Sequence, residues 1–106
     1  MQIQLTDHAA KRFGERYGML SSKPIMQHIS RVLNNGHWII RNITKHKGYT
    51  EKELLVEYGK DAIVMRERVP DKRTVDNQHN RYYILTVYDK LVDDHTNEKQ
   101  EEKYDG

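Results

Sequence analysis

The segment LTDHAAKRFGERYG, from Leu5 to Gly18, predicts a short helix with two chemically different faces. Thr6 or Asp7 can cap its N-terminus by accepting a hydrogen bond from a free backbone N–H, and Gly18 is suited to end it. At about 100° per residue, apolar side chains gather on one face and polar side chains on the other. The apolar face, which we expect to be buried, consists of Ala9, Ala10, Phe13 and Tyr17. The polar face consists of His8, Arg12, Glu15 and Arg16.

The polar face of this helix combines an imidazole with two guanidinium groups. His8 and Arg12 are four residues apart, so their side chains are neighbours, and Arg16 continues the row by one turn. Such a row can both move a proton and hold a phosphate. The alternative is an ordinary solvated helix face, although Glu15 is the only acid available to neutralise the stripe.

A second helix is predicted over residues 23–34. Ser22 can cap it, Pro24 fits its first turn, and the run Asn34-Asn35-Gly36 tolerates the left-handed conformation that often ends a helix. Its apolar positions recur at helical spacing, and His28 lies off that stripe, which predicts a surface histidine. The apolar positions are Ile25, Ile29, Val32 and Leu33.

From residue 37 onward the periodicity changes to that of strands. Four strands are predicted, over residues 38–41, 53–58, 62–69 and 81–89, with an exposed, mobile loop over 70–80. Residues 1–5 are either a short edge strand or a lead-in to the first helix. The order predicts an α+β domain over 1–89, in which two helices pack on one face of a four-stranded antiparallel sheet. Residues 90–106 predict a largely disordered acidic tail.

Charge is distributed unevenly along the 106 residues. Residues 90–106 hold 3 of the 18 Lys and Arg residues and 6 of the 16 acids, which leaves 15 basic and 10 acidic residues in 1–89. The predicted domain therefore carries a net charge of +5, which suits an anionic partner such as RNA, DNA or a nucleotide. The acidic tail is either an interaction arm for a protein partner or a segment that folds back on the basic domain.

Composition also bounds the chemistry. The chain has no cysteine, which excludes disulfides and thiolate metal sites, and no histidine pair has metal-ligand spacing. We therefore expect no metal and no cofactor. No apolar run approaches the length of a membrane span, and the N-terminus lacks a signal segment, so the prediction is a cytoplasmic protein without a membrane partner.

The last strand supplies the second set of candidate groups. Strict alternation assigns Tyr83, Leu85 and Val87 to the core and places Tyr82, Ile84, Thr86 and Tyr88 on the other face. In a meander, Arg66 and Arg68 would then lie beside Thr86 and Tyr88 and form a phosphate-binding surface. The alternative is that both arginines pair with Glu57 or Glu53 across the hairpin.

Together these groups suggest cleavage of RNA without a metal. The 2′-OH of RNA can attack the adjacent phosphate, so a protein need supply only a base, cationic stabilisation and an acid. His8 is the candidate base, Arg12 and Arg16 are the candidate phosphate clamp, and Thr86 and Tyr88 are candidate positioning or proton-donating hydroxyls. Further nucleic-acid contacts are expected from Lys11, Arg66, Arg68 and Arg81.

Two segments carry a resemblance to a known family. Residues 6–18, TDHAAKRFGERYG, resemble the opening helix of small RelE-like domains and of related phage-encoded members of the barnase–EndoU–colicin–RelE superfold. Residues 81–88, RYYILTVY, resemble the closing strand of those domains. The resemblance implies a metal-independent, toxin-like ribonuclease acting on tRNA or mRNA, with a possible cognate antitoxin or host protein as partner. It implies site roles for His8, Arg12, Arg16, Thr86 and Tyr88.

A second function is compatible with the same fold. The chain could be a non-catalytic binding protein of phage or mobile-element type, whose partner is a nucleic acid, a nucleotide or a host protein. That function needs the basic surface but not His8. A basic surface therefore belongs to both hypotheses, whereas the histidine separates them.

Overall fold

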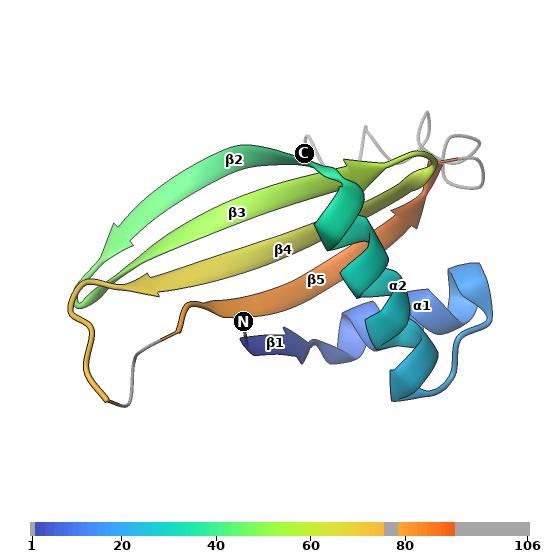
Figure 1. Cartoon of the computed structure of the whole chain (residues 1–106), viewed down its shortest axis with the longest axis horizontal. Helices are drawn as coiled ribbons and strands as arrows, with labels where there is room; N and C mark the ends of the chain where they lie inside the picture. The colour runs from blue at the N-terminus through green and yellow to red at the C-terminus, as the bar shows by residue number, and fades with distance from the viewer. Residues whose placement is uncertain (1, 76–78, 91–106) are drawn as a thin grey trace.

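The protein is an α+β domain built on a five-stranded mixed sheet, seen in a computed structural model that describes residues 2–75 and 79–90. The strands lie in the order β1-β5-β4-β3-β2 (Figure 1). Helices α1 (Asp7–Tyr17) and α2 (Ser22–Asn35) follow β1, and the other strands come after them. The strands are β1 (Gln2–Leu5), β2 (His37–His46), β3 (Tyr49–Tyr58), β4 (Asp61–Pro70) and β5 (Arg81–Asp89).

The predicted sheet of four antiparallel strands lacks one strand, and the pairing of that strand is parallel. Residues 2–5 form a fifth strand, β1, which pairs in parallel with β5 from Gln2 opposite Arg81 to Leu5 opposite Ile84. The remaining pairs are antiparallel, as predicted. The edge-strand alternative for the first residues is therefore confirmed. The acidic tail predicted over 90–106 lies outside the described residues except for Lys90.

Helix α1 begins and ends as its sequence predicts. The Thr6 hydroxyl accepts a hydrogen bond from the Ala9 N–H at 3.1 Å and also lies 2.7 Å from the carbonyl of Ile84. At the other end Gly18 adopts a left-handed conformation with φ of 68°. The cap thus joins the start of α1 directly to β5.

Helix α2 differs from its prediction at both ends. It includes Ser22, and its capping position, Ser21, makes no side-chain hydrogen bond to the helix. Gly36 ends the helix with φ of −82°, so a left-handed conformation is not what requires glycine there. Glycine is required there because there is no room for a side chain: a β-carbon on Gly36 would lie 2.4 Å from the carbonyl oxygen of Val32.

A β-bulge in β5 overturns the predicted faces of that strand. Val64 pairs with Thr86 and Met65 with Ile84, which leaves Leu85 outside the register. The extra residue shifts the alternation, so Ile84 and Val87 are both fully buried against the helices. Tyr83 and Leu85, which the sequence assigned to the core, are only half-buried.

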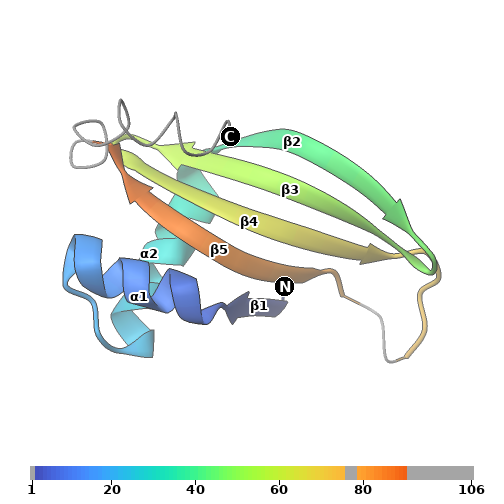
Figure 2. The same cartoon turned by 180° about the vertical axis from the view of Figure 1, so that it is seen from behind.

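Both helices pack on the same face of the sheet and at one end of it (Figure 1). Figure 2 shows the opposite face, over which neither described helix passes. The hairpin between β2 and β3 projects away from the helices. The core lies between the helices and the sheet and consists of Ala9, Phe13, Ile25, Ile29, Val32, Leu33, Leu54, Val56, Ile63, Met65, Ile84 and Val87.

Candidate functional site

The polar face of α1 forms the row that the sequence predicts. Nε of Arg12 donates to Nε2 of His8 over 3.4 Å, as expected for residues four apart. Glu15 serves all three neighbouring cations, with separations of 3.9 Å to Lys11, 3.3 Å to Arg12 and 3.7 Å to Arg16. One carboxylate therefore partly neutralises three positive charges.

Helix α1 lies alongside the second half of β5. Thr6 bonds to the carbonyl of Ile84 at one end of the helix, and the Tyr17 hydroxyl donates to the carbonyl of Tyr88 over 3.0 Å at the other. The structure therefore places the row of His8, Arg12 and Arg16 next to the strand that carries Thr86 and Tyr88. Thr86, however, pairs with Val64 and lies on the sheet face opposite the one on which Ile84 and Val87 pack against the helices.

The other candidate arginines lie farther along the sheet than predicted. Arg66 pairs with Tyr83 and Arg68 with Arg81, whereas Thr86 and Tyr88 pair with Val64 and Ala62. The prediction that Arg66 and Arg68 lie beside Thr86 and Tyr88 is wrong, because the antiparallel register brings the end of β4 to the start of β5. These arginines form a separate group in the second half of β4, opposite the start of β5. That end of β4 extends beyond the helices (Figure 2).

Glu51 on β3 is the acid that both arginines contact. It lies 3.7 Å from Arg66 and 3.3 Å from Arg68, and 3.4 Å from His46. The alternative that both arginines form ion pairs across the hairpin is thus confirmed, but the acid is Glu51 instead of Glu57 or Glu53. Burial alone would raise the pKa of Glu51, yet the hydrogen bond from Arg68 and the charge of Arg66 outweigh it and hold that pKa below its usual value.

Tyrosine rings surround the guanidinium of Arg68. Its central carbon lies 4.5 Å from the ring centre of Tyr49 and 5.4 Å from that of Tyr83. The Tyr49 ring also stacks on His46 at 4.7 Å. A cavity of about 140 Å³ opens beside these groups. Its lining consists of Gly48, Tyr49, Arg68, Pro70, His79 and Arg81.

A buried polar cluster beneath α2 was not predicted from the sequence. His28, expected on the surface, is only 4% exposed, because the ring of Tyr17 at 4.6 Å and the ring of Phe13 at 5.6 Å cover it. Asp61 lies in the same cluster and accepts a hydrogen bond from the Tyr17 hydroxyl over 2.8 Å. The spacing of His28 from Ile25 and Val32 could have predicted its burial, since it shares their face of α2. Its contacts with residues 17 and 61 could not, because they join three separate elements.

Burial and the neighbouring charges together shift the pKa of His28. Burial lowers the pKa of His28; the charges of Arg31 and Lys60 lower it further, while that of Asp61 opposes them. Lys60 also donates to Asp61 over 3.2 Å and to Asp89 over 3.0 Å. Through Tyr17 of α1 and Arg31 of α2, which both contact Asp61, the cluster joins the two helices to the start of β4.

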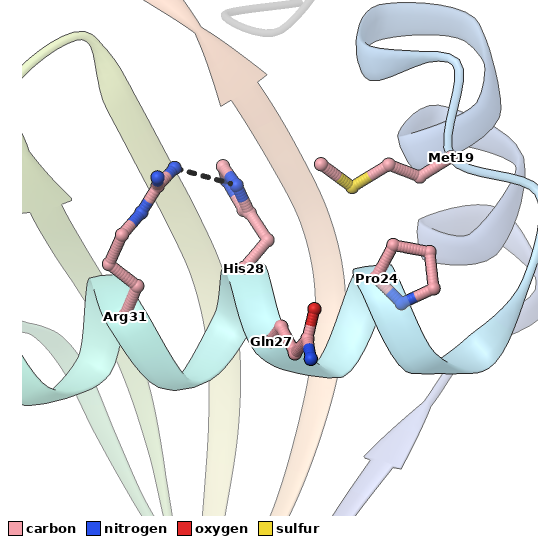
Figure 3. A pocket seen from close by; sticks show the side chains of 5 residues that line it. All are labelled: Met19, Pro24, Gln27, His28 and Arg31. Atoms are coloured by element: carbon pink, nitrogen blue, oxygen red, sulfur yellow. Dashed lines mark hydrogen bonds between the residues drawn. The ribbon is translucent and has the colours of Figure 1, made fainter.

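A cavity of about 290 Å³ lies beside this cluster (Figure 3). Arg31 and His28 line one side of it, where an Arg31 nitrogen lies 3.2 Å from Nδ1 of His28. The rest of the lining is Met19, Pro24 and Gln27. Two of its polar side chains, Arg31 and His28, are already bonded to each other.

Comparisons with protein-family models, curated protein sequences and solved structures give no match to this chain. The resemblance to RelE-like domains therefore stays a prediction from the two quoted segments. Neither α1 nor α2, the helices of the described chain, is long and apolar enough to cross a membrane. Within 2–75 and 79–90, no group of three or more potential metal-ligating side chains comes together.

Proposed function

We propose that this protein binds RNA on the sheet face opposite the helices. The observation that carries the proposal is the Arg68 guanidinium, which lies over the rings of Tyr49 and Tyr83 at 4.5 and 5.4 Å. Tyrosine rings provide stacking surfaces for unpaired bases, and arginine contributes both charge and a planar face. Together they combine the two interactions on which single-strand binding depends.

The charge of the surrounding surface supports the same function. Arg66, Arg68 and Arg81 lie on neighbouring registers of β4 and β5, and the acid that contacts two of them is Glu51. The positive charge therefore exceeds the negative charge around the tyrosines. A surface of this kind attracts phosphates and weakens its hold as salt rises.

Fluorescence anisotropy with a labelled single-stranded RNA tests this proposal. Charge reversal at Arg66 (Arg66→Glu) should weaken binding by about tenfold or more at low salt. Lys23→Glu makes the same charge change on α2, on the helix side of the sheet, and should leave affinity within about twofold. Equal losses in both variants would show that only net charge matters and would count against this face.

The second candidate function is metal-independent cleavage of the bound RNA. It is favoured by the row of His8, Arg12 and Arg16 on one face of α1, which places an imidazole beside guanidinium groups. Arg12 donates to Nε2 of His8 over 3.4 Å, so Arg12 must release that nitrogen before it can accept a proton. In this mechanism His8 removes the proton from the 2′-OH, and Arg12 and Arg16 stabilise the phosphate as it becomes pentavalent. Thr86 and Tyr88 position the phosphate or protonate the departing oxygen.

Incubation with total tRNA and a generic mRNA in EDTA tests cleavage separately from binding. Discrete fragments ending in cyclic phosphate, lost in His8→Ala, would support the ribonuclease. His28→Ala is an informative comparison, because it removes a histidine from the buried cluster instead of the α1 row. Intact RNA with a folded wild-type protein that still binds RNA would leave binding as the function.

A further inference from the structure

Two like charges face each other at the end of the tyrosine-lined surface. Arg68 on β4 and Arg81 on β5 are direct partners in the antiparallel register. Like charges directly opposite one another on a sheet destabilise the pairing. Glu51 contacts Arg68, whereas Arg81 makes no ion pair within the described ranges 2–75 and 79–90. The pair of arginines therefore keeps one positive charge that Glu51 does not neutralise.

The cavity beside these two arginines has donors to offer. It measures about 140 Å³, and both Arg68 and Arg81 line it. Nε of Arg68 is buried and has no hydrogen-bond partner. A buried N–H without a partner costs free energy, so the Arg68 side chain is incompletely satisfied. An anion of modest size in the cavity would contact the parts of Arg68 and Arg81 that line it and would offset the repulsion between the two positive charges.

We propose that this cavity is a phosphate-binding subsite formed by Arg68 and Arg81. Guanidinium groups bind phosphate oxygens through paired, charge-assisted hydrogen bonds, which fits two arginines on adjacent strands. The ring of Tyr49 also lines the cavity, and because it lies under the Arg68 guanidinium it helps to hold that group at the cavity wall.

The inference rests on the proposed function in one respect, since we take the phosphate to belong to RNA. The same chemistry could be met by a terminal phosphate, by an internal phosphate of the chain or by free phosphate. The cavity lies at the edge of the tyrosine-lined surface, beside the turn at Gly48. This position favours the end of a strand, so a terminal phosphate is the expected occupant.

The test combines inorganic phosphate with RNA of defined ends. Arginine Nε–H signals are followed by NMR as phosphate is added, and affinity is measured for one RNA sequence with a 5′-phosphate, a 3′-phosphate or neither. The variants are Arg81→Gln and, as the matched control, Arg41→Gln, an exposed arginine of the same sheet that contacts Glu53 instead. Phosphate should shift the Arg68 and Arg81 signals, and one terminal phosphate should tighten binding about fivefold.

The outcomes separate the subsite from the proposed function. Loss of both effects in Arg81→Gln, but not in Arg41→Gln, supports the subsite. Phosphate-dependent shifts without an end effect, with phosphate competing against RNA, support the subsite with an internal phosphate as its occupant. Shifts in a protein that binds no RNA support a free-phosphate site and contradict the proposed function. RNA binding with no response of Arg68 or Arg81 to phosphate overturns the subsite alone.

Discussion

Nε2 of His28 lies 3.9 Å from Oδ1 of Asp61, and the two side chains are only 2% and 7% exposed. Arg31 can only donate, so its 3.2 Å contact makes Nδ1 of His28 the acceptor and places the proton of the neutral ring on Nε2. That N–H faces Asp61 at a distance too long for a hydrogen bond. The histidine is therefore held neutral in a cluster whose hydrogen bonds are otherwise made by Tyr17, Lys60 and Arg31.

This arrangement predicts a loss of stability in mild acid. Burial lowers the pKa of His28 in the folded state, so below about pH 6.5 the unfolded chain binds a proton that the folded chain resists. The free energy of unfolding should therefore fall as the pH drops from 7 toward the lowered folded-state pKa. Urea unfolding at a series of pH values measures this slope.

The variant His28→Phe isolates the contribution of the imidazole. It keeps an aromatic ring against Phe13 and Tyr17 but cannot take up a proton. Its unfolding free energy should depend less steeply on pH between 7 and 5 than that of the wild-type protein. His46→Phe, which removes a histidine from the exposed hairpin, should keep most of the wild-type slope. Identical slopes in wild type and His28→Phe would contradict the buried-histidine account.

The Tyr17 hydroxyl should contribute to stability through two contacts. It lies 2.8 Å from Oδ1 of Asp61 and 3.0 Å from the carbonyl of Tyr88, and so joins α1 to β4 and β5. Tyr17→Phe should lower the free energy of unfolding by about 1–2 kcal/mol, because it leaves a buried carboxylate with one donor fewer. Tyr58→Phe, at an exposed strand end, should change it by less than about 0.5 kcal/mol. An unchanged stability in Tyr17→Phe would show that Lys60 and Arg31 satisfy Asp61 without the Tyr17 hydroxyl.

Local patterns in the sequence predicted the elements but not how distant ones meet. The spacing of Ala9 and Phe13, the Thr6 cap and Gly18 predicted α1 correctly, because these signals depend only on neighbouring residues. The position of α1 beside β5, and the parallel pairing of β1, depend on contacts between residues about 80 positions apart. No local pattern encodes such contacts.

The same distinction explains the errors at the candidate site. The row from His8 to Arg16 was predicted from helical spacing and is present. The neighbours of Arg66 and Arg68 were not predicted correctly, because they depend on the register between β4 and β5, which the long 70–80 connection leaves open. His28 was misplaced because the prediction counted only apolar residues as buried. It lies three residues after Ile25 and four before Val32, and therefore on the buried face of α2. Its contact with Tyr17 of α1 was not visible in the periodicity of one helix.

The bulge at Leu85 predicts different sensitivities for two residues that strict alternation places on the same face. Ile84 is fully buried on the helix side, whereas Thr86 lies on the other face and is half-buried. Ile84→Ala should lower the free energy of unfolding by about 2–5 kcal/mol through loss of buried methyl and methylene groups. Thr86→Ala should stay within about 0.5 kcal/mol. Urea unfolding of both variants checks the register, and a larger loss in Thr86→Ala would contradict it.

Two glycines of the helical region should respond to alanine in opposite directions. A β-carbon on Gly36 would lie 2.4 Å from the carbonyl of Val32 and 2.9 Å from that of Glu57, and backbone atoms cannot easily retreat. Gly36→Ala should therefore lower the free energy of unfolding by about 1–3 kcal/mol. At Gly14, inside α1, the nearest atom is 3.3 Å away at the tip of Leu20, whose side chain is 89% exposed and free to move. Gly14→Ala should raise the free energy of unfolding by about 0.5–1 kcal/mol, because alanine favours the helix. Thermal and urea unfolding of the two variants measure both signs, and a destabilised Gly14→Ala would mean that Leu20 is held in place by a contact with α1.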